Sequence, residues 1–291
     1  GPYHPDFPNP PRGGSFGNNW PKDPAALAQL EPVYRGYAQE LRAAGLLDEA
    51  YVYTFDEPKP DSPRVPEVTK LMHRADPALR NLVVLEDGVD ADGMTTWLAD
   101  ADIVCLRNVT FDAGEAEKLT AQGKDVWLYV SGPEPPYPTL VIDYPAMAAR
   151  ILPWMCWKYG LKGLLYWCVN YWTTNPYQEP MNTTWQQNGN GLLYYPGPNG
   201  PVPSIRLELL RDGMEDYEYL VLLRRLIDQR AMQAHAADPA LIAQAERLLA
   251  VDPALVESMR TYANDPEILE HNRHAIAELI EAKAVDRARN A

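Results

Sequence analysis

Five short apolar segments, separated by segments of helical length, constrain the fold of this chain more than any other feature of its sequence. They predict strands at residues 51–55, 81–87, 100–106, 125–132 and 162–172. Helical patterns are predicted around these strands, at residues 24–45, 66–74, 112–123, 143–159, 204–227, 239–250 and 265–288. Such alternation is typical of a parallel β-sheet covered by helices, so the predicted fold class is α/β.

The number and position of the strands favour the later part of a (β/α)8 barrel of the TIM type. About 50 residues precede the first predicted strand and hold one clear helix, which leaves no room for three further strands. The chain is therefore either a piece of a larger barrel enzyme or an open sheet, and we favour the first. We predict an irregular segment at 1–23, a truncated barrel-type catalytic domain at 24–227 and a helical extension at 228–291. The opening Gly1-Pro2 resembles the scar that a protease leaves after removing a tag.

Charge and motif content exclude several classes of partner. The net charge is −14 and no basic run is present, so neither nucleic acid nor an anionic membrane surface is expected as a partner. No apolar run reaches membrane-spanning length, and no signal peptide is visible. The three cysteines and five histidines form no disulfide framework and no ligand pattern, so we expect neither metal nor cofactor. Oligomeric state does not follow from the sequence.

The aromatic residues are biased toward types that suit a carbohydrate ligand. The chain has 17 Tyr and 8 Trp but only 4 Phe. Tyr and Trp combine a flat apolar face with a polar edge, which allows stacking on a sugar ring and hydrogen bonding to its hydroxyls. Ordinary core packing is the alternative for any single one of them.

Polar residues follow each predicted strand, where parallel α/β folds place their chemistry. The most notable are Asp56 and Glu57, at the end of the segment YVYTFDEP. Neighbouring side chains of a strand face opposite sides, so both carboxylates reach one pocket only if the strand ends or bulges there, and Pro58 helps to end it. One carboxylate can then donate a proton while the other stays ionised, as glycoside cleavage requires. The alternative is that the pair caps the next segment or binds a cation.

Five motifs, in order along the chain, resemble the catalytic region of glycoside hydrolase family 123. They are YVYTFDEP, GPEPPYPTLVIDYP, WKYGLKGLLYW, GNGLLYYPG and PSIRLELLRDGMEDYEYL, and the resemblance covers residues 20–227. It implies a (β/α)8 barrel, usually behind an N-terminal β-sandwich. Neither that sandwich nor the first barrel strands can be recognised in this sequence.

The resemblance implies a retaining β-N-acetylgalactosaminidase with a substrate-assisted mechanism. In such a mechanism the 2-acetamido oxygen of the sugar attacks the anomeric carbon and forms an oxazolinium ion. Glu57 is then implied as the general acid/base, and Asp56 as the residue that orients the acetamide group and stabilises charge on its nitrogen. No enzyme nucleophile is needed.

Seven further residues are candidates for substrate binding: Tyr129, Tyr137, Trp167, Asn170, Trp172, Arg206 and Glu208. A tyrosine hydroxyl at the end of the fourth strand can hold the acetamide oxygen. Trp167, Asn170 and Trp172, at the end of the fifth strand, can line the sugar pocket, although core packing is the alternative for Trp167. Arg206 and Glu208 can reach sugar hydroxyls. A structural ion-pair network is favoured for the nearby charges Arg211, Asp212, Glu215 and Asp216.

The sequence thus predicts a hydrolase that releases terminal β-linked N-acetylgalactosamine from a glycan or glycoconjugate. A hydrolase of the same fold with another sugar specificity, or a non-catalytic carbohydrate-binding protein, remains the alternative. A binding protein has no need of the acidic pair, which distinguishes the two classes. A secreted or periplasmic location is expected.

Overall fold

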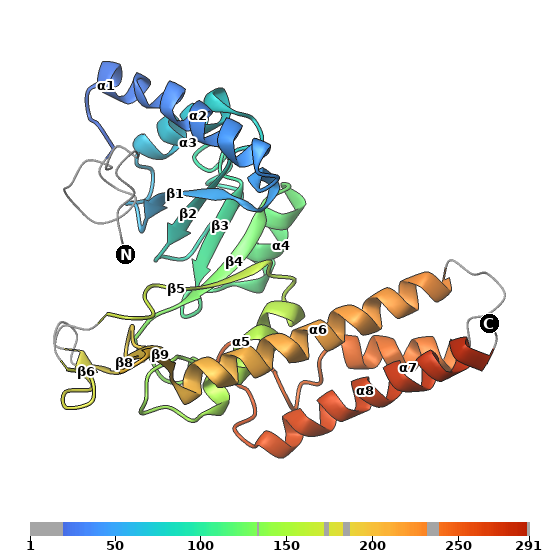
Figure 1. Cartoon of the computed structure of the whole chain (residues 1–291). Helices are drawn as coiled ribbons and strands as arrows, with labels where there is room; N and C mark the ends of the chain where they lie inside the picture. Colours follow the sequence, from blue (N-terminus) through green and yellow to red (C-terminus); the bar gives the residue numbers. More distant parts are fainter. Residues whose placement is uncertain (1–19, 133, 172–174, 183–186, 232–238, 290–291) are drawn as a thin grey trace. The chain divides into compact units, whose positions relative to one another are not determined.

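The computed structural model describes residues 20–132, 134–171, 175–182, 187–231 and 239–289 (Figure 1). Its strands are β1 (Tyr51–Asp56), β2 (Arg80–Leu85), β3 (Ile103–Arg107), β4 (Asp125–Val130), β5 (Gly163–Tyr166), β6 (Met181–Asn182), β7 (Gln187–Asn188), β8 (Tyr194–Gly197) and β9 (Gly200–Pro203). Its helices are α1 (Pro24–Ala28), α2 (Leu30–Ala43), the 3-10 turn η1 (Leu47–Glu49), α3 (Arg64–Ala75), α4 (Ala113–Ala121), α5 (Met147–Lys158), α6 (Ile205–Ala231), α7 (Pro239–Leu249) and α8 (Pro266–Arg289).

All five predicted strands are present, and they form one sheet in the order β1-β2-β3-β4-β5. The pairs β1–β2, β2–β3 and β4–β5 are parallel, as predicted. Strands β1 to β5 form an open sheet among the residues that the structure describes, and a closed eight-stranded barrel remains a proposal. None of the described helices combines the length and apolarity that are needed to cross a bilayer.

The chain divides into two compact units, and the division cuts β3 after Leu106 and β4 after Val126. The first unit comprises the described residues up to Leu106 together with Asp112–Val126. Its core is a buried run on β2, where Asn81 to Leu85 are all buried, against the apolar stripe of α3 (Val65, Val68, Leu71, Met72). A strand buried on both faces reads as a continuous apolar run, which is why β2 lacks alternation.

The second unit comprises Arg107–Phe111 and the described residues from Trp127 onward. Here α5 packs on α6, and α6 in turn contacts α7 and α8. The two helices approach closely at Gly213, because a Cβ atom at this position would lie 2.5 Å from the Arg150 carbonyl oxygen. Any residue larger than glycine would push the helices apart.

Strand β5 is shorter than predicted. The sequence predicts a strand over 162–172, but pairing with β4 ends at Tyr166. The following residues pair instead with a later segment: Tyr171 N donates to the Gly191 carbonyl (2.9 Å), and Leu193 N donates to the Val169 carbonyl (2.8 Å). The apolar pattern is the same for both partners, so periodicity alone does not reveal the change.

The segment after β5 contains two small antiparallel pairs within its described residues. They are β6–β7 and β8–β9, and the second pair places Tyr194 opposite Pro203. The motif GNGLLYYPG supplies the turn before β8 and all of β8.

Candidate active site

The carboxyl end of β1 carries an irregularity that sets the direction of Asp56. The pairing of β1 with β2 shifts register between Tyr53 and Phe55, so Thr54 is an extra residue on β1. In a regular strand, residues 53 and 56 would face opposite sides, because side chains alternate. One extra residue restores them to the same side. The Tyr53 hydroxyl accordingly donates a hydrogen bond of 2.8 Å to Asp56 Oδ1.

Tyr53 is a fixed hydrogen-bond donor for Asp56. Burial of its ring, together with the hydrogen bond to Asp56, raises the pKa of the Tyr53 phenol well above its usual value. The hydroxyl therefore keeps its proton at all physiological pH values. This bond holds one carboxylate oxygen of Asp56 in place.

Glu57 ends the strand with a strained backbone. Its φ angle is 49°, a left-handed conformation that costs a residue with a side chain on the order of 1–3 kcal/mol. Its N–H still donates to the Val84 carbonyl at 3.0 Å, so the sheet holds the turn in place. The chain turns sharply between Asp56 and Glu57. Such a turn is needed if two adjacent carboxylates are to serve one site, because neighbouring side chains of a regular strand face opposite sides. The Glu57 side chain is exposed and lines a pocket.

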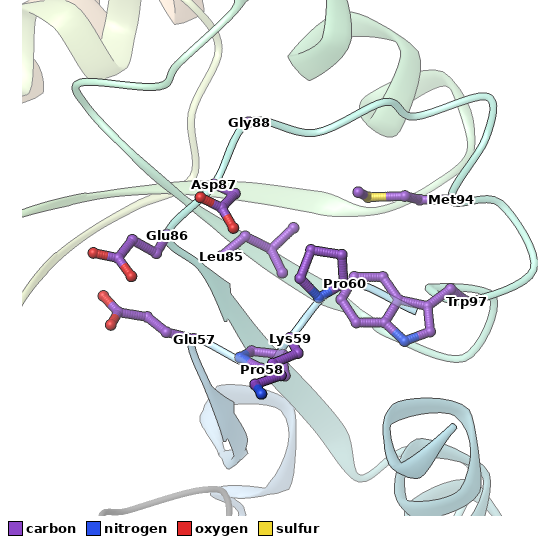
Figure 2. A pocket seen from close by; sticks show the side chains of 10 residues that line it. All are labelled: Glu57, Pro58, Lys59, Pro60, Leu85, Glu86, Asp87, Gly88, Met94 and Trp97. Carbon is purple, nitrogen blue, oxygen red and sulfur yellow. The ribbon is translucent and has the colours of Figure 1, made fainter. Parts of the chain in front are cut away.

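This pocket has a volume of about 160 Å³ and lies entirely within the first unit (Figure 2). It is lined by three segments: Glu57, Pro58, Lys59 and Pro60 after β1; Leu85, Glu86, Asp87 and Gly88 after β2; and Met94 and Trp97 before β3. Figure 2 shows the carboxylates of Glu57 and Glu86 side by side at one end and the Trp97 ring and Met94 at the other. The Glu86–Asp87 pair, which directly follows β2, therefore shares a pocket with Glu57.

The second unit holds an aromatic cluster at the end of β5. Asn190, which is only 2% exposed, accepts hydrogen bonds from Trp167 Nε1 (2.8 Å) and from the Tyr166 hydroxyl (3.0 Å). The Trp167 ring lies against Gly191, where a Cβ atom would be 2.5 Å from the ring, and it stacks at a tilt on Tyr171 with centroids 5.0 Å apart. Gly191 also has φ 74°, so both its conformation and this contact favour glycine. Trp167 is thus a rigid, half-buried platform.

The other predicted binding residues are scattered over the second unit. Tyr129 is 4% exposed in β4, so its ring belongs to the core. Tyr137 is half-buried, and the Arg260 guanidinium lies 5.7 Å above its ring. Asn170 is exposed and bridges to Leu192 through the backbone, while Trp172 lies outside the described residues. Glu208 forms an ion pair of 2.8 Å with Arg211 on the surface of α6.

Arg206, predicted to reach sugar hydroxyls, makes structural contacts. It is 7% exposed, and its guanidinium donates to the carbonyls of Leu140, Gly189 (2.8 Å) and Leu192. Its fourth contact is the Tyr195 hydroxyl at 3.3 Å. These bonds favour a role in holding the segment before α6, and sugar binding by Arg206 stays a prediction.

The ion-pair network expected along α6 is present as two separate groups. Arg211 pairs on the surface with Asp212 (3.1 Å) and Glu215 (3.6 Å). Asp216 is fully buried and meets Arg150 Nε at 2.9 Å. Arg273 Nε lies 2.7 Å from the same carboxylate, close enough for an ion pair but not aligned for a hydrogen bond.

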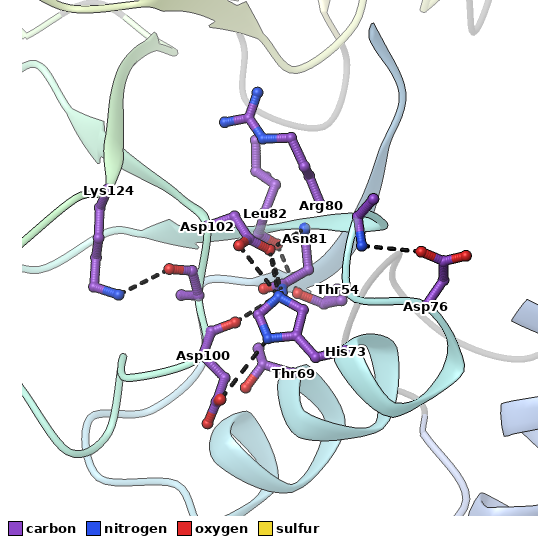
Figure 3. A network of polar contacts seen from close by, with 12 residues as sticks. Thr54, Thr69, His73, Asp76, Arg80, Asn81, Leu82, Asp100, Asp102 and Lys124 are labelled. Carbon is purple, nitrogen blue, oxygen red and sulfur yellow. Dashed lines mark hydrogen bonds and ion pairs between the residues drawn. The ribbon is translucent and has the colours of Figure 1, made fainter. Parts of the chain in front are cut away.

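A further polar network lies at the amino ends of β2 and β3, opposite the ends that carry the carboxylates (Figure 3). His73 Nε2 contacts Asp102 Oδ2 at 2.9 Å, and Asn81 donates to the same oxygen from its backbone (2.8 Å) and its side chain (2.7 Å). The hydrogen bond to Asp102 raises the pKa of His73 above its ordinary value, against an opposing effect of burial. Position at the amino ends of the strands indicates a role in stability.

Sequence reasoning missed Tyr53, Trp97 and Asn190. The bulge that turns Tyr53 toward Asp56 leaves no mark on the apolar pattern of β1. Trp97 lies between two strands, where no periodicity applies. Asn190 lies in one of the five motifs, and that position was the only signal that it has a role. Among the described residues, no group of three or more His, Cys, Asp or Glu side chains forms a possible metal site.

Comparisons with known proteins bear on the family to which the chain belongs. The family model "Glycoside hydrolase 123, catalytic domain" matches residues 18–223. Among solved structures, the chain is similar to a family 123 glycoside hydrolase from Clostridium perfringens studied for glycolipid glycan hydrolysis, with 15% identity and a TM-score of 0.59. The match covers 92% of this chain and 47% of that one, so this chain spans about half of its length. No curated protein matches. The chain belongs to the family of glycoside hydrolase 123 catalytic domains.

Proposed function

We propose that this protein is a retaining glycoside hydrolase that releases terminal β-linked N-acetylgalactosamine with the help of the substrate's own acetamide group. Family membership supports glycoside hydrolysis. The observation that carries the proposal is the end of β1, where a bulge and a left-handed residue present two adjacent carboxylates in different surroundings. Asp56 is held by a tyrosine hydroxyl, and Glu57 is exposed at a pocket.

In the first step the acetamide oxygen attacks the anomeric carbon and the glycosidic bond breaks. Glu57 transfers its proton to the departing oxygen, and the sugar becomes an oxazolinium ion. In the second step water attacks the anomeric carbon, the ring of the oxazolinium opens, and Glu57 takes a proton from that water. Two inversions give net retention, and the enzyme returns to its starting state.

Asp56 acts on the acetamide group. An ionised carboxylate accepts the N–H and thereby aligns the carbonyl oxygen with the anomeric carbon. It also stabilises the positive charge that develops on nitrogen in the transition state. The hydrogen bond from Tyr53 fixes the carboxylate before the substrate arrives, so little reorganisation is needed during the reaction.

The two roles predict opposite responses to the leaving group. Glu57→Gln should lower kcat/KM about 10²–10⁴-fold on an alkyl N-acetylgalactosaminide and much less on the nitrophenyl glycoside, because a good leaving group needs little protonation. Asp56→Asn should lower it about 10²–10³-fold on both substrates, because acetamide attack is needed in each case. Glu49→Gln, an exposed acid just before β1, serves as the matched control and should leave both rates unchanged.

The same assay decides between the function classes. The two roles would be reversed if the nitrophenyl leaving group restored the activity of Asp56→Asn but did not restore that of Glu57→Gln. Equal rates on 2-hydroxy and 2-acetamido sugars would contradict substrate assistance, and a faster rate on N-acetylglucosaminides would assign another sugar. An α-configured product in the first minutes of reaction, observed by NMR, would rule out retention.

A further inference from the structure

We propose that the pocket beside Glu57 is the subsite for the leaving group, that it takes one neutral sugar ring, and that Asp87 selects for it. This inference rests on the proposed function, because it assumes that Glu57 protonates the glycosidic oxygen. It adds a residue and a surface that the two-carboxylate mechanism does not use.

The position of the pocket assigns it to the leaving group. The group that departs is bonded to the oxygen that Glu57 protonates, so it must lie within reach of that carboxyl. Glu57 lines the pocket, whereas Asp56, the proposed partner of the acetamide, is not among the described residues that line it. The pocket, which is lined by Glu57 and not by Asp56, is therefore on the side of the glycosidic bond where the leaving group lies.

The size of the pocket fits one ring. Its volume is about 160 Å³, below the roughly 300–1,000 Å³ that is usual for sites holding drug-sized ligands. Trp97 closes it on one side, with its indole N–H fixed by a hydrogen bond of 2.8 Å to the Ser62 carbonyl. Because Trp97 is 7% exposed and anchored in this way, the wall is rigid.

The lining suits a neutral sugar. Pro60, Met94 and Trp97 offer apolar surface to the C–H face of a ring, and the carboxylates at the other end accept hydrogen bonds from its hydroxyls (Figure 2). Lys59 is the only cationic residue among the lining residues that the structure describes, against three acids. A leaving group with its own carboxylate or sulfate would face this negative end and be disfavoured.

The test uses the full chain and two disaccharides that carry the same terminal N-acetylgalactosamine, one on glucose and one on glucuronate. They differ only in the charge at one carbon of the leaving sugar. The wild type should cleave the glucose form at least about tenfold faster in kcat/KM. Asp87→Asn should lower cleavage of the glucose form about tenfold and leave the nitrophenyl glycoside within about twofold, because nitrophenol has no hydroxyls for this carboxylate.

Two further variants sharpen the result. Asp87→Lys should raise cleavage of the glucuronate form relative to the glucose form. Glu117→Gln, an exposed acid on α4 outside the pocket, removes the same charge and should change none of the three rates. Since Asp87 is exposed, both substitutions at this site are expected to fold.

Asp87 variants that slow the nitrophenyl glycoside and the disaccharide equally, or slow neither, would overturn the subsite while leaving the hydrolase intact. Equal rates on the glucose and glucuronate forms in the wild type would overturn the selection by charge. If the wild type releases no sugar from any of the three substrates, the proposed function itself fails, and the subsite with it.

Discussion

At the scale of single residues, Tyr53 is the feature that most directly tests how the site is organised. Its hydroxyl contacts Asp56, and nothing else is needed from it in the proposed mechanism. Removal of a hydrogen bond to a charged group costs about 1.5–3 kcal/mol. We therefore expect Tyr53→Phe to lower kcat about 10- to 100-fold, with little change in KM, because the carboxylate loses its orientation in the transition state.

A double-mutant cycle separates this effect from a general loss of packing. If Tyr53 acts through Asp56, the variant Tyr53→Phe/Asp56→Ala should be no slower than Asp56→Ala alone. Tyr51→Phe, at the other end of β1 and 42% exposed, is the control. Multiplicative losses in the double variant would assign Tyr53 an independent role.

At the scale of elements, the strands could be predicted from the sequence and their irregularities could not. Apolar runs of four to eight residues locate β1 to β4 within a few residues of their observed bounds. The extra residue on β1 depends on how its backbone pairs with β2, and the early end of β5 depends on competition from residues 189–194. Both features depend on which distant segment a strand residue pairs with. The competing segments have similar apolar character, so local periodicity does not distinguish them.

The elements α3, β2 and β3 meet at the His73 network, and this network predicts a pH dependence of stability. The folded pKa of His73 is raised above that of the unfolded chain, which is about 6.5. Its stabilising effect is therefore complete below pH 6.5 and is lost as the pH rises through the folded pKa. Urea unfolding should show that His73→Gln costs about 1 kcal/mol more at pH 6 than at pH 9.

The charged groups that face His73 are Asp100 and Asp102, and Asp102 makes the closer contact. In an Asp102→Asn background, His73→Gln should have nearly the same cost at both pH values. A pH-dependent cost that persists in this background would assign the effect to another partner.

At the scale of the whole molecule, the sequence reveals the position of the two candidate acids more readily than the surroundings of the candidate sugar-binding residues. Asp56 and Glu57 could be found because strand ends are visible in the sequence and a parallel sheet brings its carboxyl ends to one edge. Arg206 is a binding candidate by residue type and position, while its burial against three carbonyls depends on the fold of a distant segment that the sequence does not reveal. A residue type and its position after a loop do not distinguish a ligand contact from a structural one.

One buried carboxylate joins three helices from distant parts of the chain. Asp216 of α6 meets Arg150 of α5 and Arg273 of α8, and it accepts a hydrogen bond of 3.2 Å from Trp154. Asp216→Asn removes the buried counter-charge that Arg150 and Arg273 share, and only the more exposed ion pair of Arg150 with Glu270 is kept. We therefore expect a loss of about 3–5 kcal/mol in the free energy of unfolding. The melting temperature should fall by about 10 °C. Asp212→Asn, which removes a surface charge on the same helix, should change it by less than about 2 °C.

A melting temperature that stays within 2 °C for Asp216→Asn would show that these helices are held by apolar contacts alone. Apolar packing is extensive here, since Leu220, Leu223 and Ile227 of α6 are buried. The measurement therefore separates the contribution of the ion pairs from that of the apolar face.

The contacts of Arg206 also have a consequence for the order of folding during synthesis. Its guanidinium binds carbonyls that lie 66, 17 and 14 residues earlier in the chain. The segment that precedes α6 therefore leaves the ribosome before the residue that fixes it has been made. Until Arg206 has emerged, the carbonyls of Gly189 and Leu192 lack this donor. We therefore expect the contacts of this segment to be completed only once the first turn of α6 has formed.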